Sequence, residues 1–254
     1  MDRQLLRVYL LELAGSFAFV TIAAGVVCVN HMALPAGQSA GVAPLTLHQP
    51  GAVGVALASG LTWAVLVALL GPVTGGWLNP AVTMALWLWG RLSTTRAAWL
   101  IGAQLLGGLL AGLCLRYMFA DDILRSARFG ATHLNLLAYP DLGPERLWPG
   151  LGAGVAIELG LTFLFVFAIF GGPLEGAGWR SGAVLAAATL FAFPLTGAAL
   201  NPARWLGPTL WECFRETGRQ PFADAFVYVA GPVLGAIVAG WCCFKLMPER
   251  PAGK

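Results

Sequence analysis

Two stretches of the sequence decide the fold: TGGWLNPAVT at residues 74–83 and GAALNPARWL at residues 197–206. Each places Asn-Pro-Ala after a run of small residues, within otherwise apolar sequence. Asn is among the best residues for capping the start of a helix, and Pro is favoured at the first helical position, where its missing N–H costs nothing. Asn79-Pro80-Ala81 and Asn201-Pro202-Ala203 therefore predict two helix starts. In a soluble protein these would be two ordinary capped helices.

The composition places these helix starts in a membrane. Of the 254 residues, 58% are hydrophobic and 11% are charged, and the mean hydropathy is +0.74. A soluble domain carries about 25% charged residues, so we expect an integral membrane protein of the all-α class. At membrane depth, the non-helical backbone that precedes a helix start must be buried in protein or line a water-filled cavity.

Several function classes are disfavoured by the same data. The net charge of +3 and the lack of a basic run argue against a nucleic-acid partner. The five cysteines form no CxxC pair, and His31, His48 and His133 are isolated in connecting segments, where solvated side chains are the default. No set of nucleophile and base is evident. We therefore expect no metal site, no cofactor and no enzymatic activity.

Six stretches are long and apolar enough, or nearly so, to cross a bilayer, for which a helix needs about 20 residues. They are 5–30, 51–71, 97–119, 150–171, 180–196 and 223–247. The first lacks a clear cleavage site, so we expect a span and not a leader. The fifth is the shortest. Two further apolar segments, 79–89 and 201–213, are too short to span, so we expect half-length helices that enter the membrane and return.

The distribution of Lys and Arg predicts that both termini are cytoplasmic. The outer segments then balance their charges, both in the connection 116–148 and around the second tripeptide. The inner segments carry an excess of positive charge, in a protein that we expect in a plasma membrane or a bacterial inner membrane. Their basic residues are Arg3, Arg7, Arg91, Arg96, Arg180, Lys245, Arg250 and Lys254, and their acidic residues are Asp2, Glu175 and Glu249.

Two acidic residues within predicted spans reveal an internal repeat. The first span reads LELAGSFAFV at 11–20, with Glu12, and the fourth reads IELGLTFLFV at 157–166, with Glu158. The Pro/Gly-rich connection 31–50 lengthens the first half. Because three spans per half is an odd number, the second half must be inverted relative to the first. We expect a single channel domain over 1–254, with halves at 1–120 and 149–254, an arrangement typical of transport proteins.

The two Asn-Pro-Ala motifs, with Arg204 directly after the second, inside a six-span inverted repeat, resemble the aquaporin (major intrinsic protein) family. The resemblance covers essentially the whole chain, including Glu12, Glu158 and Gly231-Pro232 of the last span. It implies six transmembrane helices plus two re-entrant half-helices and a passive channel for water and small neutral solutes. It also implies a homotetramer with one pore per subunit.

The resemblance also assigns residues to the pore. Asn79 and Asn201 would be the central hydrogen-bond donors, and carbonyl groups of the approach loops would form a ladder of acceptors. The two half-helices would aim their positive N-terminal ends at the midplane and repel protons and cations, as is general for aquaporin-type pores. The ladder positions are Gly75, Gly76, Trp77, Gly197 and Ala199.

The cargo depends on the constriction that the resemblance places at Ser59, Thr189, Ala198 and Arg204. An intramembrane Arg is expensive and usually functional. Water-selective members carry a bulky aromatic residue and usually His where this chain has Ser and Thr. We therefore expect a wider, hydroxyl-lined constriction that passes water and small uncharged solutes.

Two features of the sequence bear on which solute passes. Trp205 follows Arg204, where glycerol-conducting members have Asp, so the family's glycerol pattern does not fit. A facilitator of larger neutral solutes such as glycerol, urea or metalloid acids remains the alternative. A nearby side chain turning inward, such as Trp63, Phe191 or Phe193, would narrow the constriction.

Glu12 and Glu158 leave open a function of another class. As a proton relay, they would indicate a proton-coupled secondary transporter. As structural acceptors, they would hold the backbone of their loops, and the matched positions in the two halves favour this second role. Small residues in the spans predict close helix packing, at Gly102, Gly107, Gly108 and Gly235.

Overall fold

The computed structural model describes residues 2–32, 50–138, 147–215 and 220–247. Most of the predicted connection 31–50, with His48, lies outside these ranges, as do Asp141, Glu145 and Arg146 of the outer connection and the terminal charges Glu249, Arg250 and Lys254. Within the described ranges the regular structure is helical and contains no strand. The long helices are α1 (Arg3–Asn30), α2 (Gly51–Thr74), α4 (Thr94–Met118), α6 (Leu147–Phe170), α7 (Ala177–Ala192) and α9 (Ala225–Trp241), which continues as the π turn η4 (Cys242–Leu246).

Five of the described helices are long and apolar enough to cross a membrane: α1, α2, α4, α6 and α9 with its η4 extension. They correspond to five of the six predicted spans. The remaining helix, α7, has 16 residues and ends at Ala192, short of the predicted end at residue 196. Pro194 lacks the N–H that would continue the helical ladder, which accounts for the earlier end. The all-α membrane fold class is confirmed.

Both Asn-Pro-Ala motifs begin short helices, α3 (Pro80–Leu88) and α8 (Pro202–Glu212). The Oδ1 of Asn79 accepts the N–H of Ala81 at 2.9 Å, and the Oδ1 of Asn201 accepts the N–H of Ala203 at 2.9 Å. With 9 and 11 residues, and about 1.5 Å of rise per residue, each helix covers about half of a 30 Å bilayer core.

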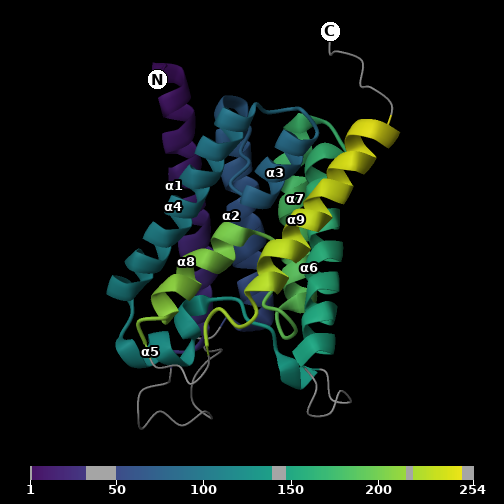
Figure 1. Ribbon diagram of the computed structural model, residues 1–254. Coiled ribbons are helices and arrows are strands. Elements are labelled where there is room, and N and C mark those ends of the chain that lie inside the picture. The colour runs from purple at the N-terminus through teal and green to yellow at the C-terminus, as the bar shows by residue number, and fades with distance from the viewer. Residues whose placement is uncertain (1, 33–49, 139–146, 216–219, 248–254) are drawn as a thin grey trace.

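In Figure 1 the two short helices lie between α4 and α9, and they pack against these two long helices. The start of α1 and the end of η4 lie at one end of the bundle, and α5 (Asp121–Ser126) lies at the other. The helix α3 lies in the half near the start of α1, whereas α8 lies in the half near α5. We call the α5 end the outer end. The two half-helices therefore approach each other from opposite ends of the bundle.

Glycines allow the helices to pack closely where they cross. A side chain at Gly107 would collide with the carbonyl of Leu13 between α4 and α1, and one at Gly235 with the carbonyl of Leu159 between α9 and α6. Gly108 faces the backbone of α8 in the same way. Gly102, which we predicted at such a contact, faces open space, so the prediction was wrong for contacts within this chain.

The outer connection 116–148 contains structure that the sequence did not suggest. It forms α5, η1 (Arg128–Gly130) and η2 (Leu136–Ala138). Leu124 and Phe129 are buried against Cys28 of α1, so this segment packs against the ends of the helices. It follows that residues of this connection can position groups near the outer end of α8.

Candidate pore site

The two half-helices meet through reciprocal hydrogen bonds between their capping residues. The Nδ2 of Asn79 donates to the carbonyl of Leu200 at 2.9 Å, and the Nδ2 of Asn201 donates to the carbonyl of Leu78 at 2.9 Å. Both Asn side chains are buried. Each amide is thus oriented at both ends, because its oxygen caps its own helix while its nitrogen reaches the loop of the other half.

The loop before α3 is held by the carboxylate of Glu12. The Oε1 of Glu12 accepts the hydroxyl of Thr74 at 2.6 Å and the N–H of Trp77 at 3.0 Å. Its Oε2 accepts the N–H of Leu78 and the side-chain amide of Gln104, both at 2.8 Å. A carboxylate offers about four acceptor sites, so these donors use its full capacity.

Glu158 holds the loop before α8 with three corresponding contacts, without a counterpart of Gln104. Its Oε1 accepts the hydroxyl of Thr196 at 2.7 Å and the N–H of Ala199 at 3.0 Å, and its Oε2 accepts the N–H of Leu200 at 2.8 Å. Both Glu side chains are fully buried. In each half, therefore, one buried acid orients the last residues before the Asn-Pro-Ala motif.

The two loops adopt an uncommon backbone conformation. Leu78, Ala198 and Leu200 have φ values of 45°, 51° and 52°. Residues with a side chain rarely adopt this left-handed region, and such strain persists only where the surroundings determine it. Here the two Glu carboxylates and the two Asn amides supply the necessary contacts.

The four residues expected at the constriction surround one small cavity of about 10 Å³. A cavity needs about 10–15 Å³ to hold a water molecule, so this space suits about one water. It is smaller than the wide opening we expected from Ser and Thr. The cavity is lined by Phe19, Ala23, Val55, Ser59, Leu185, Thr189, Gly197, Ala198, Ala199 and Arg204.

Arg204 is almost entirely buried, with 5% of its surface exposed. Its Nη2 donates to the carbonyl of Ala23 at 3.2 Å, which ties the guanidinium to α1. Among the described residues its Nη1 has no hydrogen-bond partner. A buried donor without a partner is costly, so an acceptor that reached this nitrogen would stabilise it.

Besides Ala23, Val55 and Leu185, the cavity lining contains Phe19, which our sequence analysis also missed. It lies seven residues after Glu12, two helical turns along the same face of α1, and that spacing is the signal by which it can be found. Val55 and Leu185 likewise stand one turn before Ser59 and Thr189. The residues we considered for narrowing the opening do not line the cavity: Trp63, Phe191 and Phe193.

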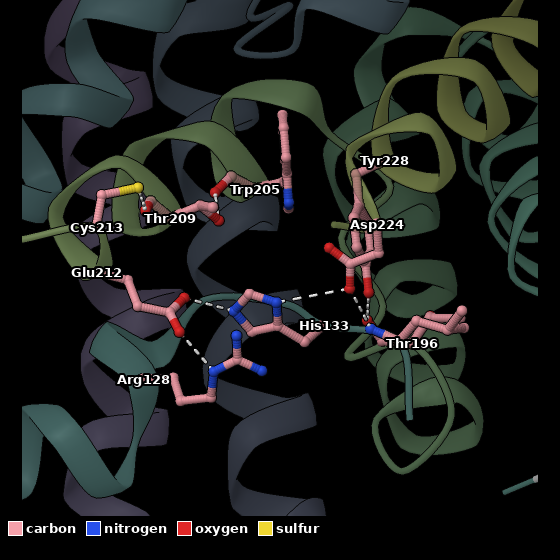
Figure 2. A network of polar contacts seen from close by, with 10 residues as sticks. Arg128, His133, Thr196, Trp205, Thr209, Glu212, Cys213, Asp224 and Tyr228 are labelled. Carbon is pink, nitrogen blue, oxygen red and sulfur yellow. Dashed lines mark hydrogen bonds and ion pairs between the residues drawn. The ribbon is translucent and has the colours of Figure 1, made fainter. Parts of the chain in front are cut away.

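A polar network at the outer end of α8 corrects our prediction that His133 is a solvated loop residue (Figure 2). Its Nε2 lies 2.6 Å from Oε2 of Glu212, and its Nδ1 lies 3.6 Å from Oδ2 of Asp224, which precedes α9. Arg128 neutralises Glu212 through a 2.5 Å contact between Nε and Oε1. The His133 side chain is 11% exposed. This cluster is called the outer clamp below.

The surroundings of His133 change its affinity for a proton. Burial alone would lower the pKa of its imidazole, but the nearby carboxylates of Asp224 and Glu212 outweigh that effect. As a result, the pKa of His133 is raised above its ordinary value of 6.5. The imidazolium form therefore persists to higher pH than in an ordinary histidine, and in that form both ring nitrogens can donate.

A larger cavity of about 270 Å³ lies beside the outer clamp. It is lined in part by Arg128, His133 and Asp224, together with Leu136 and Leu151. It shares no lining residue with the small cavity around Arg204. The two spaces are therefore lined separately: the larger one by residues of the outer clamp and its neighbours, and the smaller one by the four residues expected at the constriction.

Comparison with known proteins gives a match across the chain. The family model described as the major intrinsic protein family matches residues 2–243. The lens fiber major intrinsic protein of Gallus gallus is 38% identical over 196 residues, which cover 74% of this chain and 67% of that protein. Aquaporin TIP4-4 of Zea mays is 34% identical over 248 residues, which cover 94% of this chain and 86% of that protein.

Two further similarities extend over nearly the whole length. The glycerol uptake facilitator protein-like 6 of Lactiplantibacillus plantarum is 28% identical over 245 residues, covering 93% of this chain and 96% of that protein. The crystal structure of the aquaglyceroporin from Plasmodium falciparum superposes with a TM-score of 0.75 at 20% identity, covering 95% of this chain and 96% of that one. The structural match shows a shared fold.

Proposed function

The chain belongs to the major intrinsic protein family, and we propose that it conducts water and small uncharged solutes through one pore while excluding protons and ions. Family membership itself makes it a passive membrane channel for water or small solutes, and not an enzyme. The finer proposal assigns the path of the solute, which runs past Arg204 and then between Asn79 and Asn201.

The reciprocal bonds of Asn79 and Asn201 carry this proposal. A side-chain amide nitrogen has two hydrogens, and the carbonyl of the opposite loop takes one of them. The second hydrogen of each Asn is left to donate to an oxygen in the pore. A water that accepts from both must turn its own hydrogens away along the pore, which interrupts a chain of proton transfer.

The acceptors of the pore follow from the geometry of the peptide group. In a trans peptide the N–H points opposite to the preceding carbonyl. The N–H groups that point toward Glu12, Glu158, Thr74 and Thr196 therefore turn the preceding carbonyls away from those side chains. We propose that these carbonyls line the path as acceptors; they belong to Gly75, Gly76, Trp77, Gly197, Ala198 and Ala199.

The exclusion of ions is assigned to three positive groups. The N-terminal ends of α3 and α8 each carry about half a positive charge, and both ends meet at the two Asn residues. Arg204 adds a full charge beside the narrow cavity. A cation or proton meets repulsion from all three, whereas a neutral molecule meets only hydrogen-bonding groups.

Water is the proposed main cargo, because the cavity beside Arg204 suits about one water molecule. A second candidate is a facilitator of larger neutral solutes such as glycerol, urea or metalloid acids. The small hydroxyl side chains of Ser59 and Thr189 favour it, and so does the resemblance to a glycerol uptake facilitator-like protein. Passage of these solutes requires the cavity lining, which includes the ring of Phe19, to yield.

The buried acids support a channel over a proton-coupled transporter. Glu12 and Glu158 are fully buried and accept hydrogen bonds from the loops that they hold. Protonating either one would place an O–H where an N–H donor already points. We propose that both act as structural supports of the acceptor ladder.

We further propose the arrangement in the membrane. The matched contacts of Glu12 and Glu158 support an inverted repeat with halves at 1–120 and 149–254 in one channel domain. The charge distribution supports cytoplasmic termini in a plasma membrane or bacterial inner membrane. The family resemblance supports a homotetramer with one pore per subunit. Crosslinking of the protein in native membranes tests the tetramer.

Stopped-flow light scattering on proteoliposomes tests the function. We expect osmotic shrinkage faster than that of empty liposomes, with a low activation energy and no dependence on a proton gradient. Glycerol, urea and a metalloid acid are then offered in turn to rank the solutes. Shrinkage no faster than in empty liposomes would contradict the channel, and flux that saturates and follows the proton gradient would favour the transporter.

A further inference from the structure

The outer clamp lies at the junction of three elements that position the proposed constriction. His133 belongs to the outer connection, Glu212 ends the half-helix that carries Arg204, and Asp224 stands at the N-cap of α9. Figure 2 shows the imidazole between the two carboxylates, with the guanidinium of Arg128 beside Glu212. Among the described residues, these are the charged groups that face the imidazole.

The residues on either side of His133 connect it to the wall of the constriction cavity. The N–H of Leu134 donates to Oδ2 of Asp224 at 2.7 Å, and this is the oxygen that faces the imidazole. The N–H of Asn135 donates to the carbonyl of Leu195 at 2.9 Å. Thr132 packs closely on Gly197: a Cβ atom added to Gly197 would lie 3.1 Å from the Cα and Cβ atoms of Thr132.

Gly197 and Ala198 line the cavity that also contains Arg204. The backbone of the segment 195–198 is therefore covered on its outer side by residues 132–135. Because interiors are closely packed, a shift of this covering segment is transmitted to the cavity wall. The position of the outer connection is thus one determinant of the constriction.

We propose that His133 is a positioning residue of the pore, whose protonated imidazole holds the outer connection between Glu212 and Asp224 and thereby fixes the Gly197–Ala198 wall of the constriction. The imidazolium has an N–H on each nitrogen and donates toward both carboxylates. A neutral imidazole has one N–H. If this stays with Glu212, the bare Nδ1 faces an acceptor oxygen of Asp224, which weakens the hold on the connection.

This arrangement predicts the direction in which solute permeability changes with pH. Below the raised pKa of His133 the connection is held, and the cavity admits about one water. As pH rises through that pKa, the wall at Gly197 loosens and a larger neutral solute passes more easily. Water already fits, so its flux changes less. The ratio of solute to water permeability therefore rises with pH.

The experiment measures water and urea permeability of proteoliposomes from about pH 5.5 to 8.5, with the same pH on both sides, since the orientation of inserted protein is mixed. In the unsubstituted protein we expect the urea-to-water ratio to rise about two-fold or more across the range, as expected for coupling through packed elements. His133→Gln should abolish the pH dependence. His31→Gln, which removes an exposed histidine at the end of α1, is the matched control and should retain it.

A second variant separates the titration from a merely structural role. Glu212→Gln removes one carboxylate from the imidazole, so the midpoint of the response should move to lower pH by about one unit. This variant decides the question if His133→Gln does not fold. A flat profile in the unsubstituted protein would overturn the proposal, as would an unchanged response in His133→Gln or an unmoved midpoint in Glu212→Gln.

The inference rests on the proposed pore, but the two can fail separately. Absence of water flux at every pH would contradict the channel function itself. Normal water flux with a pH-independent urea-to-water ratio would contradict only the role of His133.

Discussion

The ring of Phe19 stands edge-on to the indole of Trp63, with 5.2 Å between the ring centroids. Trp63 is fully buried, and its Nε1–H donates to Oγ of Ser181 at 2.9 Å across the contact between α2 and α7. Phe165 packs edge-on against the same indole. Phe19 thus reaches the constriction cavity from a fixed aromatic cluster, which makes it a candidate for setting the size limit of the pore.

Shortening Phe19 should widen the pore for solutes. Removing a steric group from a pocket changes discrimination by about tenfold or more, so Phe19→Ala should raise glycerol permeability by that order while water permeability changes little. Phe19→Leu is a milder variant, because truncating a buried Phe to Ala costs about 3–5 kcal/mol of stability. Stopped-flow traces for both solutes give the ratio. Phe17→Ala, on the same helix but outside the cavity lining, should leave that ratio unchanged.

Filling the hydroxyl side of the cavity should have the opposite effect. Ser59→Phe combined with Thr189→His places larger side chains at two lining positions, and we expect glycerol and urea flux to fall more than water flux. Leu61→Phe, at an exposed position of the same helix, serves as the control. Equal losses for water and solutes would count against these two residues lining the constriction.

Neutralising Arg204 should admit cations. At an effective dielectric constant of about 20, a unit charge 4 Å from another contributes about 4 kcal/mol, so Arg204→Gln should increase proton leak about tenfold or more. A pH-sensitive dye inside the proteoliposomes reports the leak. Water permeability should persist, because the two Asn donors remain. The control is Arg116→Gln, which removes an arginine from a partly exposed ion pair with Asp121 and should not increase the proton leak.

The buried acids should behave as structural supports. In Glu12→Gln or Glu158→Gln, an amide NH2 replaces one acceptor oxygen and faces backbone N–H groups that lose their partner, at about 1–3 kcal/mol each. Melting temperature and water permeability should fall together. Glu175→Gln, at an exposed position, is the control for the loss of a charge. A proton relay would instead show unchanged stability and a lost response to the proton gradient.

The stability of the folded protein should depend on His133 as pH changes. The folded-state pKa of this residue is raised, so its contribution to stability is fully present below the ordinary value of 6.5 and is lost as pH rises through the raised value. Thermal unfolding in detergent should therefore show a melting temperature that falls across this interval. The same melting curve measured for His133→Gln should lack this decline; a decline of equal size would show that another group titrates.

Much of the fold could be predicted because its signals are local. An Asn followed by Pro predicts a helix start through capping and backbone geometry, and α3 and α8 begin at the expected residues. Apolar length predicted five spans, and the weak signal at 180–196 corresponds to the shortest long helix, α7. The close packing at Gly107 and Gly235 could be expected from small residues in a span, but the open position of Gly102 depends on the neighbouring helix.

The candidate site was predictable only where the family resemblance assigns a position to it. Ser59, Thr189, Ala198 and Arg204 surround one cavity, but Phe19 adjoins it from a helix far away in sequence. The burial of His133 was missed because a lone histidine in a polar connection carries no sign of the carboxylates that approach it. Those carboxylates lie 79 and about 90 positions further along the chain. Long-range packing decides such contacts.

The reciprocal hydrogen bonds of Asn79 and Asn201 have a consequence for the order in which the pore assembles. The side-chain amide of Asn79 donates to the carbonyl of Leu200, which is synthesised much later. The side-chain amide of Asn201 donates to the carbonyl of Leu78, which has been synthesised before it. If the first half enters the bilayer during translation, the side-chain amide of Asn79 lacks the carbonyl of Leu200 until the second half-helix arrives. Assembly of the conducting centre is a late event that neither half can complete by itself, and a chain truncated before Leu200 should remain in the membrane without a path for water.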